Sequence, residues 1–275
     1  MDEARAIDRK IVVNPRESPQ TINVSTKFGK IICPSRMLVC GPSLSGKSTF
    51  MKYLVKYREH IFDQKFERII YCSPQCLTGA QDNYVDFLRT QFSNLELSSE
   101  LPCVNTLNIT SDGTHKLILI DDFMLSFNQS QNAFKLLTIH SHHMQITAVV
   151  TSHNLFASSK YQKTLTRNYS EIVMLHAQSD KLSLRTLGTQ MFPDSPRILI
   201  RAMNWVEKQE GELRYLLLDI SPLTHLPSNM IIRTNIFWFW TFKPFSRFCT
   251  KKPRLGWHCT ALSDICERQQ QGRTL

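Results

Sequence analysis

The stretch VCGPSLSGKSTFMKYL, residues 39–54, limits the possible folds more than any other part of this sequence. An apolar run ends at Gly41, and apolar residues at roughly helical spacing resume after Gly46. Together with Lys47 and Ser48, these glycines match every fixed position of the phosphate-binding pattern G-x-x-x-x-G-K-[ST]. The order strand, loop, helix predicts a nucleoside triphosphate site and disfavours a Gly/Ser-rich turn that matches by chance.

The residue types in this loop suit phosphate chemistry. Glycine allows the backbone N–H groups to approach phosphate oxygens, and the N-terminus of the following helix adds unpaired donors. We expect Lys47 to reach the β- and γ-phosphates and the Ser48 hydroxyl to ligate Mg²⁺. The full set expected to bind ATP is Gly41, Ser45, Gly46, Lys47, Ser48 and Thr49.

A second motif, KLILIDDF, begins at residue 116. Four apolar residues at 117–120 predict a buried strand that ends in two adjacent carboxylates. We expect Asp121 to hold Mg²⁺ or its water and Asp122 to polarise the attacking water. Because a carboxylate pair at the end of a buried strand is costly without a nearby cation, the pair supports a metal-nucleotide site.

Short apolar segments alternate with longer amphipathic ones from residue 31 to about 220. The segments expected to be strands are 30–40, 67–74, 116–122, 145–153, 170–177 and 213–220, and helices are expected near 82–95 and 128–141. Near-continuous apolar strands separated by helices predict an α/β fold with a mostly parallel sheet covered on both faces. With the two motifs, this favours a P-loop NTPase of the additional-strand class, whose sheet inserts a strand between the two motif strands.

Three segments are expected along the chain. Residues 1–30 form an irregular lead-in, with Pro15 and Pro19 arguing against a regular helix, and residues 31–237 form the ATPase domain. Residues 238–275 form an aromatic and basic tail that is poorly ordered or non-homologous. Such a tail could instead stack bases and contact phosphates.

Composition adds limits of its own. The formal net charge is +10, and half of it comes from residues 237–275, which hold seven Lys/Arg against two Asp/Glu. The remaining charge fits either a local DNA-facing patch or an ordinary soluble enzyme. No apolar run reaches the roughly 18 residues that a membrane span requires, and eight scattered cysteines suit a reducing compartment. We therefore expect a soluble, intracellular protein without a membrane partner.

The later strands resemble those of a known family. The matching segments are VVTSHNLF, TLTRNYSEIVMLHAQSDKLSLRTLGTQMFPD (164–194), and YLLLDISP with IIRTNIF (215–237). In these segments the chain resembles the FtsK/HerA-type genome-packaging ATPases of Polinton (Maverick) elements and adintoviruses, which are relatives of the poxvirus A32-like ATPases. With the two nucleotide motifs, the resemblance spans roughly 31–237. The block 151–194 makes it specific, since the phosphate loop is generic.

The resemblance also implies a sensor of the γ-phosphate and an arginine finger, at two positions where this sequence differs from the usual family residues. Family members usually carry T-Q-N-L-F, and alignment on Asn154-Leu155-Phe156 places His153 at the glutamine, the expected sensor of the γ-phosphate. A neutral imidazole can donate or accept one hydrogen bond and so partly replaces an amide. The family arginine corresponds to Lys163, so Arg167 is the candidate for a finger acting on a neighbouring subunit.

The resemblance implies an ATP- and Mg²⁺-dependent, DNA-stimulated ATPase that translocates double-stranded DNA into a capsid. Implied partners are DNA bound non-specifically through its phosphates, further copies of the chain in a ring, and a capsid or portal component. Implied sites of action are the host nucleus or the site of virion assembly. The alternatives are a DNA helicase or recombination ATPase, and a nucleotide-binding remnant of an integrated element that no longer turns over.

Other clusters receive plainer interpretations. Cys72 and Cys76 are expected to be loop thiols, because no second ligand pair lies at usable spacing. The histidines of HSHHM, residues 140–144, are expected on an exposed helix end. An excess of Lys and Arg at 155–190 fits a DNA channel and a solvated face equally well.

Overall fold

The computed structural model of the 275-residue chain describes residues 10–13, 22–25, 30–76, 83–105, 109, 112–156, 160–175, 181–208, 213–221 and 230–233. All of them belong to one compact unit, Met1–Phe239. The predicted tail, 238–275, lies outside the described residues. None of the described helices has the length and apolar character needed to cross a bilayer.

The described strands form one sheet in the order β2-β1-β10-β9-β8-β3-β7-β6-β4-β5. From β8 to β5 all neighbours are parallel, whereas β9, β10, β1 and β2 continue the sheet with antiparallel pairs. The bounds are β1 Lys10–Val13, β2 Ile22–Ser25, β3 Arg36–Cys40, β4 Arg68–Cys72, β5 Leu95–Ser98, β6 Lys116–Ile120, β7 Ile146–Ser152, β8 Glu171–Leu175, β9 Tyr215–Asp219 and β10 Met230–Arg233.

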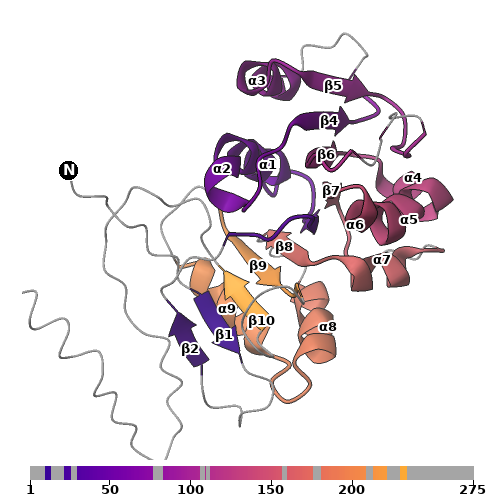
Figure 1. The fold of residues 1–275 in the computed structure, drawn as a ribbon. Coiled ribbons are helices and arrows are strands. Elements are labelled where there is room, and N and C mark those ends of the chain that lie inside the picture. Colours follow the sequence, from indigo (N-terminus) through magenta and orange to yellow (C-terminus); the bar gives the residue numbers. More distant parts are fainter. Residues whose placement is uncertain are drawn as a thin grey trace, which may run out of the picture. The chain divides into compact units, whose positions relative to one another are not determined.

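Helices cover both faces of the parallel strands (Figure 1), with α1, α2 and α3 on one side and α4 to α7 on the other. The bounds are α1 Lys47–Lys56, α2 Arg58–Ile61, α3 Asn83–Gln91, α4 Met124–Gln129, α5 Gln131–Lys135, the π-helix η1 Leu136–His140, α6 Ser141–His143, α7 Gln162–Asn168, α8 Lys181–Met191 and α9 Ile198–Val206. This arrangement confirms the predicted α/β class.

The core shows why these apolar runs form strands. Alternate residues of each parallel strand enter the cluster under α1 and α3, as Met37 and Val39 of β3 and Leu117 and Leu119 of β6 do. The residues between them point to the opposite face and are equally buried, among them Leu38. Because both faces are covered, both sets are apolar, and the strands read as continuous apolar runs.

The six predicted strands are all present but shorter than expected, and the segment predicted at 30–40 is a strand over Arg36–Cys40. The N-terminal segment departs from the expectation, since β1 and β2 lie within the supposed irregular lead-in and pair with each other, β1 also pairing with β10. Pro15 and Pro19 both fall between these two strands. Proline disfavours a helix interior but leaves short extended segments before and after it free to join a sheet.

The region predicted as one helix at 128–141 is a series of short pieces. Helix α5 passes directly into η1 and then α6. Within this run, the Thr138 hydroxyl donates to Phe134 O at 2.8 Å and the Ser141 hydroxyl to Leu137 O at 2.8 Å. Such side-chain bonds to carbonyls one turn earlier compete with the regular ladder, which agrees with the irregular winding.

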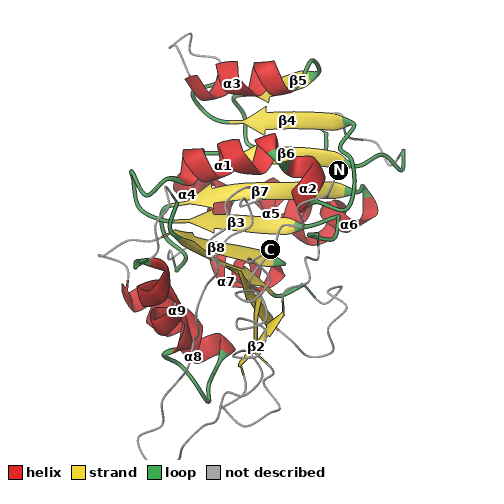
Figure 2. Cartoon of the chain, turned by 90° about the vertical axis from the view of Figure 1, so that its left-hand side faces the viewer, coloured by secondary structure: helices red, strands yellow, loops and turns green. Residues whose placement is uncertain are grey.

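The order of the central strands positions the site. β7 lies between β3, which leads into the phosphate-binding loop, and β6, which ends in the carboxylate pair. In Figure 2 the neighbouring strands β7, β3 and β8 have their arrowheads at one edge of the sheet. The additional strand between the two motif strands is thus β7, and its end meets both motifs.

Candidate active site

The loop between β3 and α1 has a backbone that requires glycine. Gly46, at the N-cap of α1, has φ +98°, in the left-handed region. A Cβ on Gly41 would lie 2.5 Å from Ser45 Oγ, because the loop closes tightly on itself. Leu44 also has a positive φ, 65°. The matched glycines therefore allow the curvature that a phosphate cradle needs.

Unpaired polar groups line this loop. Ser45 Oγ is buried and has no hydrogen-bond partner within the described part of the chain. Ser48 and Thr49 are exposed in the first turn of α1, where N–H groups lack intrahelical partners and the helix dipole favours an anion. An orphaned hydroxyl, a glycine cradle and a helix N-terminus together fit the phosphates of a nucleotide.

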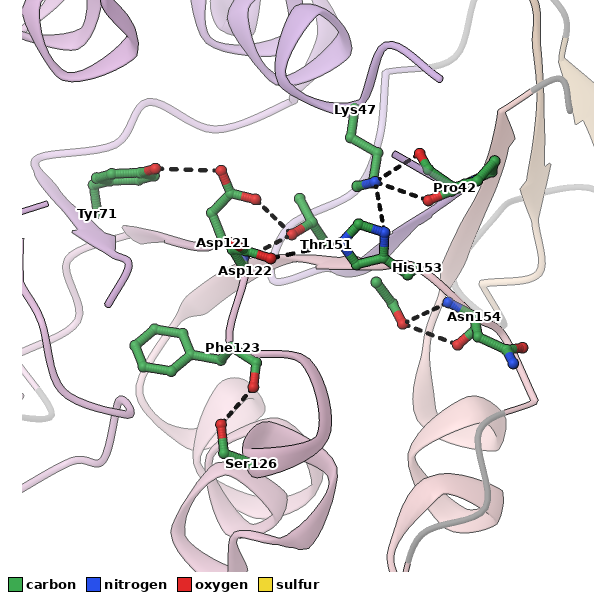
Figure 3. A network of polar contacts seen from close by, with 12 residues as sticks. Pro42, Lys47, Tyr71, Asp121, Asp122, Phe123, Ser126, Thr151, His153 and Asn154 are labelled. Carbon is green, nitrogen blue, oxygen red and sulfur yellow. Dashed lines mark hydrogen bonds and ion pairs between the residues drawn. The ribbon is translucent and has the colours of Figure 1, made fainter. Parts of the chain in front are cut away.

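Lys47 reaches back across the loop (Figure 3). Its Nζ donates to Gly41 O at 2.8 Å and to Pro42 O at 2.9 Å, and lies 3.4 Å from Nδ1 of His153. Partial burial lowers the pKa of Lys47, and the nearby Asp121 carboxylate opposes that shift. The ammonium is thus held over the loop by two carbonyl oxygens.

Asp121 follows β6 and is fixed by neighbouring strands. Its N–H donates to Cys72 O at 2.8 Å. Its Oδ1 accepts from the Thr151 hydroxyl at 2.5 Å, and its Oδ2 accepts from the Tyr71 hydroxyl at 3.2 Å. Burial raises the pKa of Asp121, while these hydrogen bonds and Lys47 lower it. A carboxylate with this donor set and free lone pairs fits as a ligand of Mg²⁺ or its water, with Ser48 as the expected second ligand.

Asp122 has a different environment from its neighbour. Its side chain is 47% exposed, and its backbone adopts φ 58°. Its N–H donates to Thr151 Oγ1 at 3.2 Å, and its Oδ1 lies 3.5 Å from Nε2 of His153. Asp121 is therefore the acid whose charged form is disfavoured by burial, whereas Asp122 remains accessible to water.

The structure brings together most of the residues predicted for the site. His153, just beyond β7, contacts both Lys47 and Asp122, as Figure 3 shows. Arg167 is different: it lies in the last turn of α7, is exposed, and makes no polar contact with the site residues within the described part of the chain.

Sequence reasoning missed Thr151 and Tyr71. Both are buried near the carboxyl ends of parallel strands, and their hydroxyls converge on Asp121. In the sequence, each is visible as a polar group near the end of an otherwise apolar strand. Its contact with Asp121 depends on which strands are neighbours, and the sheet order decides that.

The other candidate ligands make no metal centre. Among the described residues, no group of three or more His, Cys, Asp or Glu side chains is arranged around a common point, and this covers the Cys72–Cys76 pair and the histidines at 140–143. Burial raises the pKa of Cys72 to about 12, so this thiol stays protonated near neutral pH.

A groove of about 640 Å³ adjoins the site on the side of His153. It runs from Pro42 past Asn154 and Phe156 to the first turns of α8, where Leu182 and Ser183 line it. Leu182 is 74% exposed. The groove leaves the His153 end of the site open to a second molecule.

No family model and no curated protein matches this chain. Among solved structures, it is similar to the genome packaging NTPase B204 from Sulfolobus turreted icosahedral virus 2 in complex with ATP-gammaS, with 12% identity and a TM-score of 0.45 over 73% of this chain and 96% of that chain. B204, the DNA-packaging ATPase from Sulfolobus Turreted Icosahedral Virus, gives 14% identity and a TM-score of 0.47 over 74% and 98%.

A KaiC-like protein from Pyrococcus horikoshii gives 13% identity and a TM-score of 0.33 over 73% of this chain and 84% of that chain. The structural neighbours include packaging NTPases.

Proposed function

We propose that this protein is a Mg²⁺-dependent ATPase that uses hydrolysis to translocate double-stranded DNA, for packaging the genome of a virus or virus-like element. The observation that carries the ATPase part is the convergence of both motifs on His153, whose two ring nitrogens lie 3.4 Å from Lys47 Nζ and 3.5 Å from Asp122 Oδ1. An ammonium for the phosphates and a carboxylate for the water thus contact the two nitrogens of one imidazole.

Each residue has a distinct role in this proposal. The cradle of Gly41, Ser45 and Gly46 binds the phosphates through backbone N–H groups and the Ser45 hydroxyl, and Thr49 adds a hydroxyl at the start of α1. Lys47 leaves the Gly41 and Pro42 carbonyls for the β- and γ-phosphates, since phosphate oxygens carry more negative charge.

Asp121 and Ser48 hold the cation, which supplies charge neutralisation between the phosphates when it is bound. Asp122 orients the attacking water and accepts its proton. His153 hydrogen-bonds Asp122 through Nε2–H, and once Lys47 has moved its unprotonated Nδ1 is free to accept a hydrogen bond from a water beside the γ-phosphate. These roles use only groups that already converge near the loop.

The translocation part of the proposal rests on the resemblance carried by residues 151–194. In it, copies of the chain form a ring and Arg167 of one copy completes the site of the next. The groove beside His153 is an open approach for such a residue. DNA is held through its phosphates without sequence specificity, and a capsid or portal component completes the assembly.

The test is steady-state ATP hydrolysis by the full chain with and without long double-stranded DNA. Lys47→Ala and Asp122→Asn are compared with Lys56→Ala, which removes an exposed lysine from the same helix α1. DNA-stimulated turnover that persists in Lys56→Ala and is lost in the other two variants supports the proposal. ATP binding without turnover above the two site variants favours the non-hydrolysing remnant.

Forked DNA distinguishes the remaining alternative. A helicase or recombination ATPase would separate the strands of a fork and gain little from blunt duplex. A translocase of duplex DNA is stimulated by blunt duplex in proportion to its length. Strand separation on forks would therefore replace the packaging proposal while leaving the ATPase assignment in place.

A further inference from the structure

Thr151 is buried at the end of β7 and makes two different hydrogen bonds with the carboxylate motif. Its Oγ1 lies 2.5 Å from Asp121 Oδ1 and 3.2 Å from the backbone nitrogen of Asp122. A backbone N–H can only donate, so Oγ1 accepts there and its single proton is directed to Asp121. One hydroxyl thereby fixes the side chain of one acid and the main chain of the next.

The second oxygen of Asp121 is held from the opposite side. The Tyr71 hydroxyl donates to Oδ2 at 3.2 Å, and the Tyr71 ring is packed edge-on against Tyr84 with centroids 5.2 Å apart. Both donors are buried, with Tyr71 2% and Thr151 6% exposed. Two rigid donors on a carboxylate fix its plane and leave further lone pairs on both oxygens for a cation.

The backbone conformation of Asp122 depends on its hydrogen bond to Thr151. Its φ of 58° is unfavourable for a residue with a side chain. The hydrogen bond from Asp122 N–H to Thr151 supports that conformation, which determines where the Asp122 carboxylate points. Loss of this bond would release the backbone of Asp122, and loss of the whole Thr151 hydroxyl would also remove one of the two donors that hold Asp121.

We propose that Thr151, with Tyr71, is a positioning residue that orients Asp121 toward the cation and Asp122 toward the attacking water. The inference rests on the proposed ATPase function and adds residues that neither motif contains. The role requires a hydroxyl at position 151, because the group must donate to the Asp121 carboxylate and accept from the Asp122 N–H at the same time.

The experiment compares Thr151→Val, Thr151→Ser and Tyr71→Phe with Thr147→Val in the full chain. Thr147 lies in the same strand, is fully buried, and its Oγ1 accepts from Ser35 N–H at 3.3 Å, away from the carboxylates. Mn²⁺ binding in the presence of a non-hydrolysable ATP analogue is measured by electron paramagnetic resonance. Amide exchange of Asp122 is followed without nucleotide, and kcat is measured against Mg²⁺ concentration.

Thr151→Val is expected to weaken Mn²⁺ binding by about 10- to 100-fold, the usual effect of losing a partner of a metal ligand. It should also raise Asp122 amide exchange and lower kcat. Thr151→Ser should keep all three readouts near those of the native chain. Tyr71→Phe should weaken Mn²⁺ binding without changing the exchange of the Asp122 amide, and Thr147→Val should leave all three readouts unchanged.

Equal Mn²⁺ affinity and equal Asp122 amide exchange in Thr151→Val and Thr147→Val would overturn the inference. A native chain without ATP turnover rejects the proposed function, and the positioning role is then still decided by Mn²⁺ binding and amide exchange.

Discussion

Nζ of Lys47 lies 3.4 Å from Nδ1 of His153, although 106 residues separate them in the chain. Because an ammonium only donates, Nδ1 accepts, and the neutral ring carries its hydrogen on Nε2, toward Asp122. The imidazole therefore links the lysine of the phosphate loop to the acid of the second motif. When Lys47 moves to a phosphate, that link is broken on one side, so the ring can report whether nucleotide is present.

This relationship predicts that the hydrogen-bonding capacity of His153 matters more than its charge. His153→Ala should lower kcat by roughly 10²-fold, a typical loss for one preorganised polar group, with little change in nucleotide affinity. His153→Gln, which restores an amide able to donate and accept, should recover most of the activity. Steady-state kinetics with a nucleotide-binding assay separates the two effects. Equal kcat values for the native chain and His153→Ala would exclude this role.

Gly46 should be irreplaceable for two separable reasons. Gly46→Ala places a Cβ in the left-handed region and within 2.8 Å of Leu213 Cδ2, so we expect a loss of about 1–2 kcal/mol in the free energy of unfolding and loss of nucleotide binding. Gly113→Ala is the matched control, because Gly113 has φ +78° and no atom within 4 Å of the added Cβ. It should lose comparable stability and keep nucleotide affinity. Denaturation and binding measurements on both variants test the distinction.

Stability should depend on pH through Asp121. Burial raises its pKa in the folded state, so the folded chain binds this proton more tightly than the unfolded chain does. The associated stabilisation is fully present below the pKa of the unfolded state and is lost as pH rises through the raised folded value. Asp121→Asn removes this dependence and should melt higher than the native chain at neutral pH without nucleotide, with the gap closing in acid.

Melting curves of both proteins across that pH range, without Mg²⁺, measure this difference. The same variant should lose Mn²⁺-nucleotide binding, a trade of function for stability common in active sites. A variant that melts lower than the native chain at neutral pH would contradict the assignment of burial as the dominant cause.

Arg167 should affect catalysis without affecting nucleotide affinity. If it acts on a neighbouring subunit, Arg167→Ala should lower kcat by about 10³-fold or more, whereas Arg185→Ala, another exposed arginine, should have little effect. Mixing Lys47→Ala with Arg167→Ala should recover part of the turnover, because some native sites then meet native arginines. Absence of recovery in a mixture that forms joint oligomers would exclude the role in trans.

Local sequence patterns were sufficient to predict the α/β class and the central strands of the sheet. Each buried parallel strand is an apolar run followed by polar residues. Each motif is also local: the residues of the loop are close to one another in the chain, and the two acids are adjacent. The strands β1, β2 and β10 have four residues each, too few for a pattern to stand out. The π-helix at Leu136–His140 interrupts a periodicity that otherwise indicated one helix.

The contacts of Thr151 and Tyr71 could not be predicted for another reason. They join strands that lie 30 and 50 residues from Asp121 in the chain. Only the sheet order makes them neighbours, and several orders are compatible with the same list of strands. The same holds for His153, which was predicted at the end of the strand expected at 145–153, whereas its contacts with both Lys47 and Asp122 were not predicted.

The pairing of β7 limits which parts of the molecule can move. It is hydrogen-bonded along one edge to β3, from Arg36↔Ala148 to Cys40↔Ser152, and along the other to β6, from Lys116↔Ile146 to Ile120↔Val150. A slip of one residue would break both ladders and exchange the buried faces. The central sheet therefore behaves as a fixed frame, and a movement coupled to nucleotide binding is expected beyond Ser152 rather than within the sheet.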